Sequence, residues 1–154
     1  MWINFMEQHD QLTIASSLEQ IEQLENKSLR SIGTWTPYQI FIHCAQSVEY
    51  SMLGYPEQKP EIFQTTIGKL AFSIFSFAGR MIHPLDDPIP GAPNLDDSNN
   101  IQLALNRLKS AYINFERYSG PLAPHFIYGD LTKEEYTLAH VMHLNNHLDE
   151  IRER

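Results

Sequence analysis

The fold of this chain is decided by residues 35–53, whose sequence is WTPYQIFIHCAQSVEYSML. Thr36 carries a side-chain oxygen that can cap the first turn of a helix, and Pro37 suits the first helical position, where a backbone N–H has no partner in the helix. Gln39 stands three residues after the cap, so its side chain can bond back to the backbone of Thr36 and complete a capping box. The pattern predicts a helix that covers most of this stretch and ends ahead of Gly54.

Helical signals also occur on both sides of this stretch. Residues 7–26 and 98–118 carry apolar side chains at three- or four-residue spacing, which is close to the helical period. Residues 132–152 open with a second capping box, in which Thr132 caps the helix and Glu135 closes the box. No stretch alternates apolar and polar residues convincingly, so no strand is predicted. We therefore predict an all-α fold, a bundle of four long helices with one additional Phe-rich helix.

The Phe-rich segment, residues 62–82, is apolar on nearly every side of the helix that it would form. Such a helix is expected to be buried, either by its own domain or by a partner subunit, so a homodimer contact is one of two alternatives. Prolines recur through residues 83–97 and deny this segment regular structure. A long proline-rich loop of this kind can border a functional site.

Length and composition predict a single domain over residues 1–154. The chain is 42% hydrophobic and 19% charged, which is enough apolar surface for a core. A net charge of −8 without a cluster of Lys and Arg argues against a nucleic-acid partner. The longest weakly charged stretch, between Lys69 and Arg80, falls short of the roughly 20 residues that span a bilayer. With no export signal at the N-terminus and a single cysteine, Cys44, we expect a cytoplasmic protein without a membrane partner.

Three histidines stand at helix positions that suit a shared metal ion. His143 and His147 are four residues apart, so they project from one face of the last predicted helix. On a helical wheel this face adjoins the apolar stripe, so both imidazoles point toward the core. His43 has the same placement on the helix predicted within residues 35–53. Two histidines from one helix and one from a facing helix leave positions open for water or substrate, as in catalytic zinc sites.

A simpler interpretation of these histidines stays open. A chain with seven histidines contains a His-x-x-x-His pair by chance fairly often, and the imidazoles would then be hydrogen-bonded at the edge of the core. His140 can pair with His143 at i+3 in place of His147, so its contribution is not decided. His9 and His83 are predicted to be ordinary surface residues.

Other residues near these helices carry weaker signals. Glu150 lies one turn from His147 and could orient its imidazole, although a solvated charge near the C-terminus is the alternative. The sequence does not decide whether His125, in the proline-rich approach to the last helix, contributes to the site. Cys44 points about 100° away from His43 toward the core, so we expect it to be a small buried hydrophobe.

The order and spacing of these motifs resemble the DinB-like (YfiT-like) metalloenzyme superfamily. The similarity is closest to a branch known only as a domain of unknown function, which also has a Trp-led second helix, a Pro-Gly loop and a His-containing turn before the last helix. The resemblance covers nearly the whole chain. The residues that carry it are 35–40, His43, 90–91, 125–129, His143 and His147.

The resemblance implies a four-helix bundle in which His43, His143 and His147 bind a divalent ion, Ni²⁺ or Zn²⁺. Relatives include metal-dependent transferases that add a low-molecular-weight thiol to a substrate, a thiol-dependent isomerase and proteins proposed to be hydrolases. We therefore expect a metal-dependent enzyme, a thiol S-transferase or a hydrolase, that acts on a small-molecule substrate. Two alternatives remain. The metal could only tie two helices together in a binding or stress-response module, or a metal-free bundle could dimerise through residues 72–77.

Overall fold

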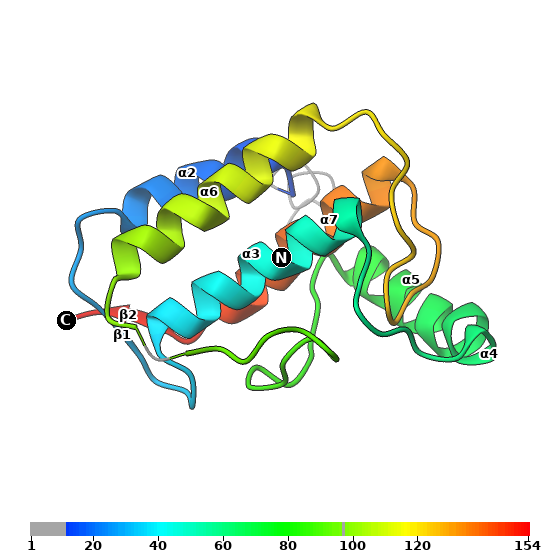
Figure 1. The fold of residues 1–154 in the computed structure, drawn as a ribbon, viewed down its shortest axis with the longest axis horizontal. Helices are drawn as coiled ribbons and strands as arrows, with labels where there is room; N and C mark the ends of the chain where they lie inside the picture. Colours follow the sequence, from blue (N-terminus) through cyan, green and yellow to red (C-terminus); the bar gives the residue numbers. More distant parts are fainter. Residues whose placement is uncertain (1–11, 97) are drawn as a thin grey trace, which may run out of the picture.

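The computed structural model describes residues 12–96 and 98–154, which are mostly helical with one small two-stranded sheet (Figure 1). His9, predicted to lie on the surface, and the first part of the helix predicted over residues 7–26 fall outside the described residues. The helices are α2 (Ile14–Leu24), α3 (Pro37–Leu53), α4 (Glu61–Phe63), the π-helix η1 (Gln64–Gly68), α5 (Lys69–Ala78), α6 (Ile101–Arg117) and α7 (Lys133–Leu148). The strands are β1 (Leu29–Ser31) and β2 (Ile151–Glu153).

The two predicted capping boxes are confirmed, and they fix where α3 and α7 begin. In α3, the Thr36 hydroxyl accepts from the Gln39 backbone N–H at 3.3 Å, and the Gln39 side chain accepts from the Thr36 N–H at 3.0 Å. In α7, the Thr132 hydroxyl accepts from the Glu135 backbone N–H at 3.1 Å, and the Glu135 carboxylate accepts from the Thr132 N–H at 2.8 Å. A cap of this kind stabilises a helix by about 1 kcal/mol. Both helices that carry the predicted ligands therefore have starts that the local sequence determines.

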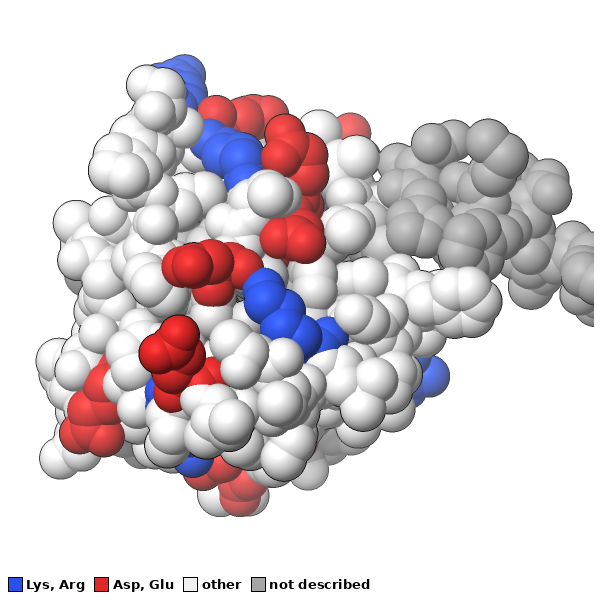
Figure 2. Space-filling view, turned by 90° about the vertical axis from the view of Figure 1, so that its right-hand side faces the viewer, with Lys and Arg blue, Asp and Glu red and all other residues white. Residues whose placement is uncertain are grey.

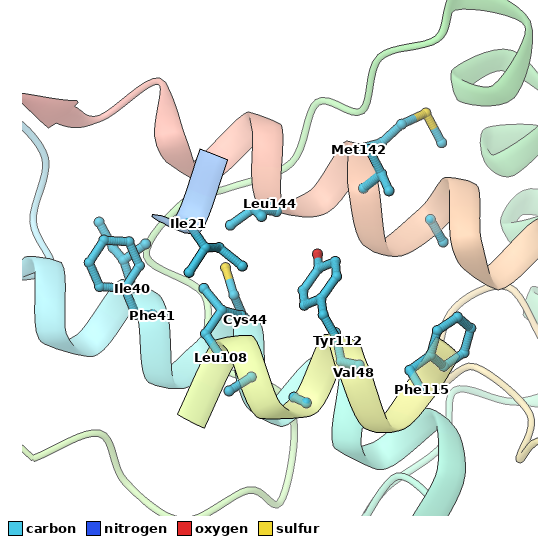
Figure 3. Packing of buried hydrophobic residues seen from close by; sticks show 14 of the residues in the cluster. Ile21, Ile40, Phe41, Cys44, Val48, Leu108, Tyr112, Phe115, Met142 and Leu144 are labelled. Atoms are coloured by element: carbon cyan, nitrogen blue, oxygen red, sulfur yellow. The ribbon is translucent and has the colours of Figure 1, made fainter. Parts of the chain in front are cut away.

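The four long helices pack side by side around a common core. Helix α3 contacts α6 and α7, and α2 contacts the same two helices from the other side (Figure 1). Tyr112 of α6 is buried, and its hydroxyl donates to the backbone carbonyl of His140 on α7 at 2.7 Å. One buried side chain from each helix meets in the interior (Figure 3): Ile21, Cys44, Leu108 and Leu144. The burial predicted for Cys44 is confirmed, and burial raises the pKa of its thiol.

The prediction that no strand forms is wrong. Strands β1 and β2 pair antiparallel, with Ser31 opposite Ile151, and α7 ends at Leu148 rather than at residue 152. Three-residue strands are too short for an alternating pattern to show, and the apolar Ile151 continues the helical stripe of α7 in the sequence. The pairing holds the end of α7 beside the segment that leads into α3, so it ties together the two helices of the predicted site.

The Phe-rich segment is helical as far as Ala78 rather than residue 82, and most of its large apolar side chains are not buried among the residues that the structure describes. Phe72 is the large apolar side chain of α5 that is buried. The face of the molecule that carries α4 and α5 is largely uncharged, with acidic and basic residues interspersed (Figure 2). The segment contacts the rest of the protein through a narrow strip on one side. None of the described helices combines the length and apolar composition that a membrane crossing requires. The exposed apolar side chains are Ile62, Ile67, Leu70, Ile74, Phe77 and Ile82.

Gly68 allows η1 to approach the turn over residues 125–129. A Cβ atom added at Gly68 would lie 2.1 Å from the backbone oxygen of Ile127, so no other residue fits without moving that turn. Gln64, one turn earlier, donates from its side-chain amide to the carbonyl oxygens of His125 and Phe126 at 3.4 and 3.3 Å. Helix η1 therefore positions the turn that precedes α7.

Candidate metal centre

Four histidine side chains converge between α3, α7 and the segment after α5. His43 comes from α3, His143 and His147 come from α7, and His83 follows α5. One ring nitrogen from each lies within 4.8 Å of the corresponding nitrogens of the other three. The structure therefore brings together all three predicted ligands and adds a fourth histidine.

The prediction that His83 is an ordinary surface residue is wrong. Its backbone N–H donates to the side-chain oxygen of Asn146 at 3.3 Å, and its Nε2 lies 3.1 Å from Nε2 of His147. The segment after α5 folds back along α7 because Asn146 offers it an acceptor and because Met81 and Ile89 are buried. Sequence spacing carries no signal for this contact, since His83 stands in a loop without periodicity.

The separations among the four nitrogens suit a small divalent ion. Nε2 of His43 lies 3.1 Å from Nε2 of His143, which matches the 3.1 Å between His83 and His147. A tetrahedral ion at about 2.0–2.1 Å from each nitrogen requires N···N distances of roughly 3.3–3.4 Å. The observed range needs movements of about 1 Å or less, which side-chain rotation can supply. The four imidazoles therefore fit a metal ion by donor type and by spacing.

Burial keeps the imidazoles in the form that binds metals. Loss of solvation and the neighbouring His83 lower the pKa of His43 to about 3, and burial with the other imidazoles lowers that of His147 to about 2. The pKa of His143 is well below its ordinary value, and that of His83 is also lowered, in both cases mainly by burial. All four side chains are thus neutral at physiological pH and have a nitrogen lone pair to donate.

The outer nitrogens of the cluster lack the support that is usual for metal ligands. Nδ1 of His43, His83 and His147 is buried without a hydrogen-bond partner among the described residues. Ligating histidines usually donate this N–H to a carboxylate or carbonyl. Glu150 does not provide it, because its buried Oε2 also has no partner among these residues. Ring contacts hold the imidazoles instead: Trp35 lies 4.9 Å from His43 and stacks on His147 at 6.1 Å, centroid to centroid.

Two further histidines lie beside the cluster but outside it. His140 is buried, and its Nε2 lies 3.1 Å from the hydroxyl of Ser51 on α3. His125 is buried in the turn before α7. A cavity of about 300 Å³ runs past these two imidazoles and past His43, His83 and His143. The cluster therefore opens onto a space large enough for a small molecule.

The fold and this site define a mostly helical protein whose histidine cluster could hold a metal ion. The model of the family described as "Protein of unknown function (DUF1569)" matches residues 6–154, so the chain belongs to that family. Neither the curated proteins nor the solved structures gave a match. The expected membership of a family of unknown function is confirmed, whereas the link to the DinB-like superfamily stays a prediction. Three further expectations also stay predictions: a single domain over residues 1–154, the cytoplasmic location, and the absence of nucleic-acid and membrane partners.

Proposed function

We propose that this protein is a metal-dependent enzyme whose divalent ion is held by His43, His143 and His147, with His83 as a fourth ligand. The observation that supports the proposal is the convergence of four histidine nitrogens, all within 4.8 Å of one another, beside a cavity. Nickel or zinc is the expected ion, as the resemblance to the DinB-like superfamily implies, and imidazole nitrogens suit both. We further propose that α2, α3, α6 and α7 form the four-helix bundle of the DinB-like superfamily.

The proposed reaction is the transfer of a low-molecular-weight thiol to a small-molecule substrate, or the hydrolysis of such a substrate. When held by the four imidazoles, the ion would accept a thiol or water as a further ligand, since zinc sites can expand beyond four ligands, and its Lewis acidity would lower the pKa of that group. The protein's own part is to keep four imidazoles neutral by burial and to hold them with Trp35 and Asn146. Met81, Ile89 and Tyr128 give the cavity an apolar wall that excludes water from a bound substrate.

A non-catalytic role is the second candidate, and the fourth histidine is the observation that favours it. Four imidazoles fill a tetrahedral shell, and filled shells are typical of structural zinc sites. The ion would then tie α3 to α7 and to the segment that carries His83. In this case His43→Ala lowers thermal stability while no thiol or ester is turned over. A metal-free bundle that dimerises through residues 72–77 of α5 is the remaining alternative.

Elemental analysis by mass spectrometry tests the proposed metal site. Untagged wild-type protein, purified without chelator, is compared with the double variant His143→Ala/His147→Ala and with His125→Asn, which alters a histidine outside the cluster. We expect a near-stoichiometric amount of metal in the wild type and in His125→Asn, and none in the double variant. Wild-type protein that stays metal-free after incubation with Zn²⁺ or Ni²⁺ would overturn the proposal.

A further inference from the structure

The imidazole of His125 is fixed in one tautomer by its own turn. Its Nδ1 accepts hydrogen bonds from the backbone N–H groups of Ile127 and Tyr128 at 3.1 and 3.2 Å. A nitrogen that accepts two N–H bonds cannot carry a proton, so the proton of the neutral ring resides on Nε2. A proton on Nδ1 would repel the backbone N–H groups of Ile127 and Tyr128, which point at the same atom. Burial also lowers the pKa of His125 well below its ordinary value. The ring therefore offers Nε2–H as a permanent hydrogen-bond donor.

The turn holds this ring rigidly. Backbone bonds of 2.8 and 2.9 Å join His125 and Gly129 in both directions. The imidazole stacks on Tyr128 with centroids 4.4 Å apart and rings inclined by 16°, and it also stacks on Phe126 at 4.8 Å. His125 is only 7% exposed and lines the cavity, yet its Nε2 has no hydrogen-bond partner among the described residues. Such a placed donor without a partner requires an acceptor from a ligand or from water.

His140, which lines the same cavity, offers a hydrogen-bond acceptor where His125 offers a donor. The Ser51 hydroxyl donates its proton to the carbonyl of Val48 at 2.6 Å, so it can only accept from Nε2 of His140, which lies 3.1 Å away. His140 therefore carries its proton on Nε2, which leaves Nδ1 with a lone pair. His140 is 2% exposed and lines the cavity, and its Nδ1 has no partner among the residues that the structure covers.

We propose that His125 and His140 form a polar subsite in which one imidazole donates through Nε2–H and the other accepts through Nδ1. This arrangement selects a neutral small molecule that carries both a carbonyl-type acceptor and an N–H donor, as a carboxamide does. A carboxylate would offer an acceptor to His125 but only negative charge to His140. Lys59 and Asp87 both line the cavity, so these two side chains do not favour an anion, and the preference of the subsite itself is read in protein freed of metal. The inference deepens the proposed function, since it rests on this cavity being the substrate site.

Nuclear magnetic resonance on the protein as purified tests the tautomers first. Long-range ¹⁵N–¹H correlations of histidine-labelled protein are expected to show Nε2–H for both His125 and His140. Detection of Nδ1–H on either ring would overturn the subsite. The spectra are recorded before and after dialysis against chelator, because a paramagnetic ion such as Ni²⁺ would broaden these signals, and the tautomers of the metal-free protein test the subsite separately from the metal site.

Three probes of similar size then test the selectivity in shift titrations: butyramide, 2-pentanone and butyrate. Butyramide can accept and donate, 2-pentanone can only accept, and butyrate is an anion. We expect butyramide to bind about three- to tenfold more tightly than 2-pentanone, the range that one net hydrogen bond provides, and butyrate to bind most weakly to protein dialysed against chelator. In that metal-free protein, equal affinities or a preference for butyrate would contradict the proposal.

Two pairs of variants assign the contacts. In His125→Asn the side-chain oxygen can replace Nδ1 for the turn while the Nε2–H donor is lost, so butyramide and 2-pentanone should both weaken by about three- to tenfold. In His125→Gln the turn loses its acceptor, so thermal stability should fall further than in His125→Asn. His140→Gln keeps a donor for Ser51 and removes the Nδ1 lone pair, so it should abolish the preference for butyramide over 2-pentanone.

Metal content is measured on the same samples, and the titrations are repeated after dialysis against chelator. If the wild type holds no metal but keeps the amide preference and both tautomers, the metal-dependent function fails and the subsite survives. If metal is present and the preference is absent, the subsite fails and the metal site survives.

Discussion

Nε2 of His83 and Nε2 of His147 lie 3.1 Å apart, although 64 residues separate them in the chain. The contact joins a proline-rich segment without regular structure to the last turn of a long helix. His143, by contrast, stands on the same helix as His147, so their relative placement follows from helix geometry alone. The cluster thus combines ligands that are placed by secondary structure with one that is placed by a loop.

This difference predicts unequal costs when single ligands are removed. His143→Ala should weaken binding of Zn²⁺ at least about tenfold more than His83→Ala, because the loop ligand loses more conformational freedom on binding than the helical one. Competition titrations with a chromophoric chelator measure both dissociation constants. Equal losses for the two variants would show that the loop is as well ordered as the helix.

Asn146 should contribute to metal affinity through His83 alone. Its side-chain oxygen accepts from the His83 backbone N–H at 3.3 Å, so Asn146→Ala frees the segment while all four histidines remain in the chain. We expect Asn146→Ala to weaken Zn²⁺ binding in the wild type and to have little effect in His83→Ala. A double-mutant cycle measures this coupling. If the losses of Zn²⁺ affinity in Asn146→Ala and His83→Ala add up in the double variant, Asn146 does not act through His83.

The metal-free protein should lose stability as the pH falls from 6.5 to 5. Folding lowers the pKa of His43 to about 3 and that of His147 to about 2, whereas in the unfolded chain both titrate near 6.5. Below pH 6.5 the unfolded chain binds protons that the folded chain does not. The free energy of unfolding should therefore fall by about 1.4 kcal/mol per pH unit for each such histidine. Urea unfolding at several pH values in this window measures the slope.

His43→Leu provides the control for this slope. Removing one buried imidazole should flatten the pH dependence by about 1.4 kcal/mol per unit. An unchanged slope would mean that His43 is protonated in the folded protein as readily as in the unfolded chain.

Two glycines with equally close neighbours should respond differently to alanine. A Cβ atom at Gly68 would lie 2.1 Å from the backbone oxygen of Ile127, and one at Gly33 would lie 2.1 Å from Oε1 of Glu150. Backbone cannot move aside, whereas a flexible carboxylate can. Gly68→Ala should therefore cost about 1–3 kcal/mol of unfolding free energy, and Gly33→Ala less than about 1 kcal/mol. Denaturant titrations measure both, and similar losses would contradict this account.

Cys44 should resist modification until the protein unfolds. Its side chain is 1% exposed in the core, and burial raises the pKa of the thiol, so little thiolate is available to react. The rate of labelling by a disulfide reagent should rise with denaturant in parallel with unfolding. Fast labelling of the native protein would indicate local opening between α3 and its neighbours.

The parts of this structure that could be predicted are those with local signals. Thr36 and Thr132 fix the starts of α3 and α7 through bonds to residues three positions away, and the four-residue spacing of His143 and His147 places them on one face. His83 could not be predicted, because its position depends on a backbone bond to Asn146 far along the chain. The short strands were missed for a related reason: their pairing is long-range, and three residues are too few to show a period.

The sequence left open whether its own domain or a partner subunit buries the Phe-rich segment, because composition does not reveal which side of a helix finds a neighbour. The sequence of this segment is apolar around most of its circumference, yet within residues 12–96 and 98–154 it packs against its neighbours mainly through a strip that includes Gly68 and Phe72. Whether a partner subunit covers the remainder stays a prediction.

The 100 residues that separate His43 from His143 also bear on the order of events during folding. Closing a loop of that length costs chain entropy that no local contact repays, so α3 and α7 can meet only once the core between them has formed. A histidine cluster assembled this late cannot act as a nucleus. It exists in the native state alone, and anything that binds it draws the population toward the completed fold.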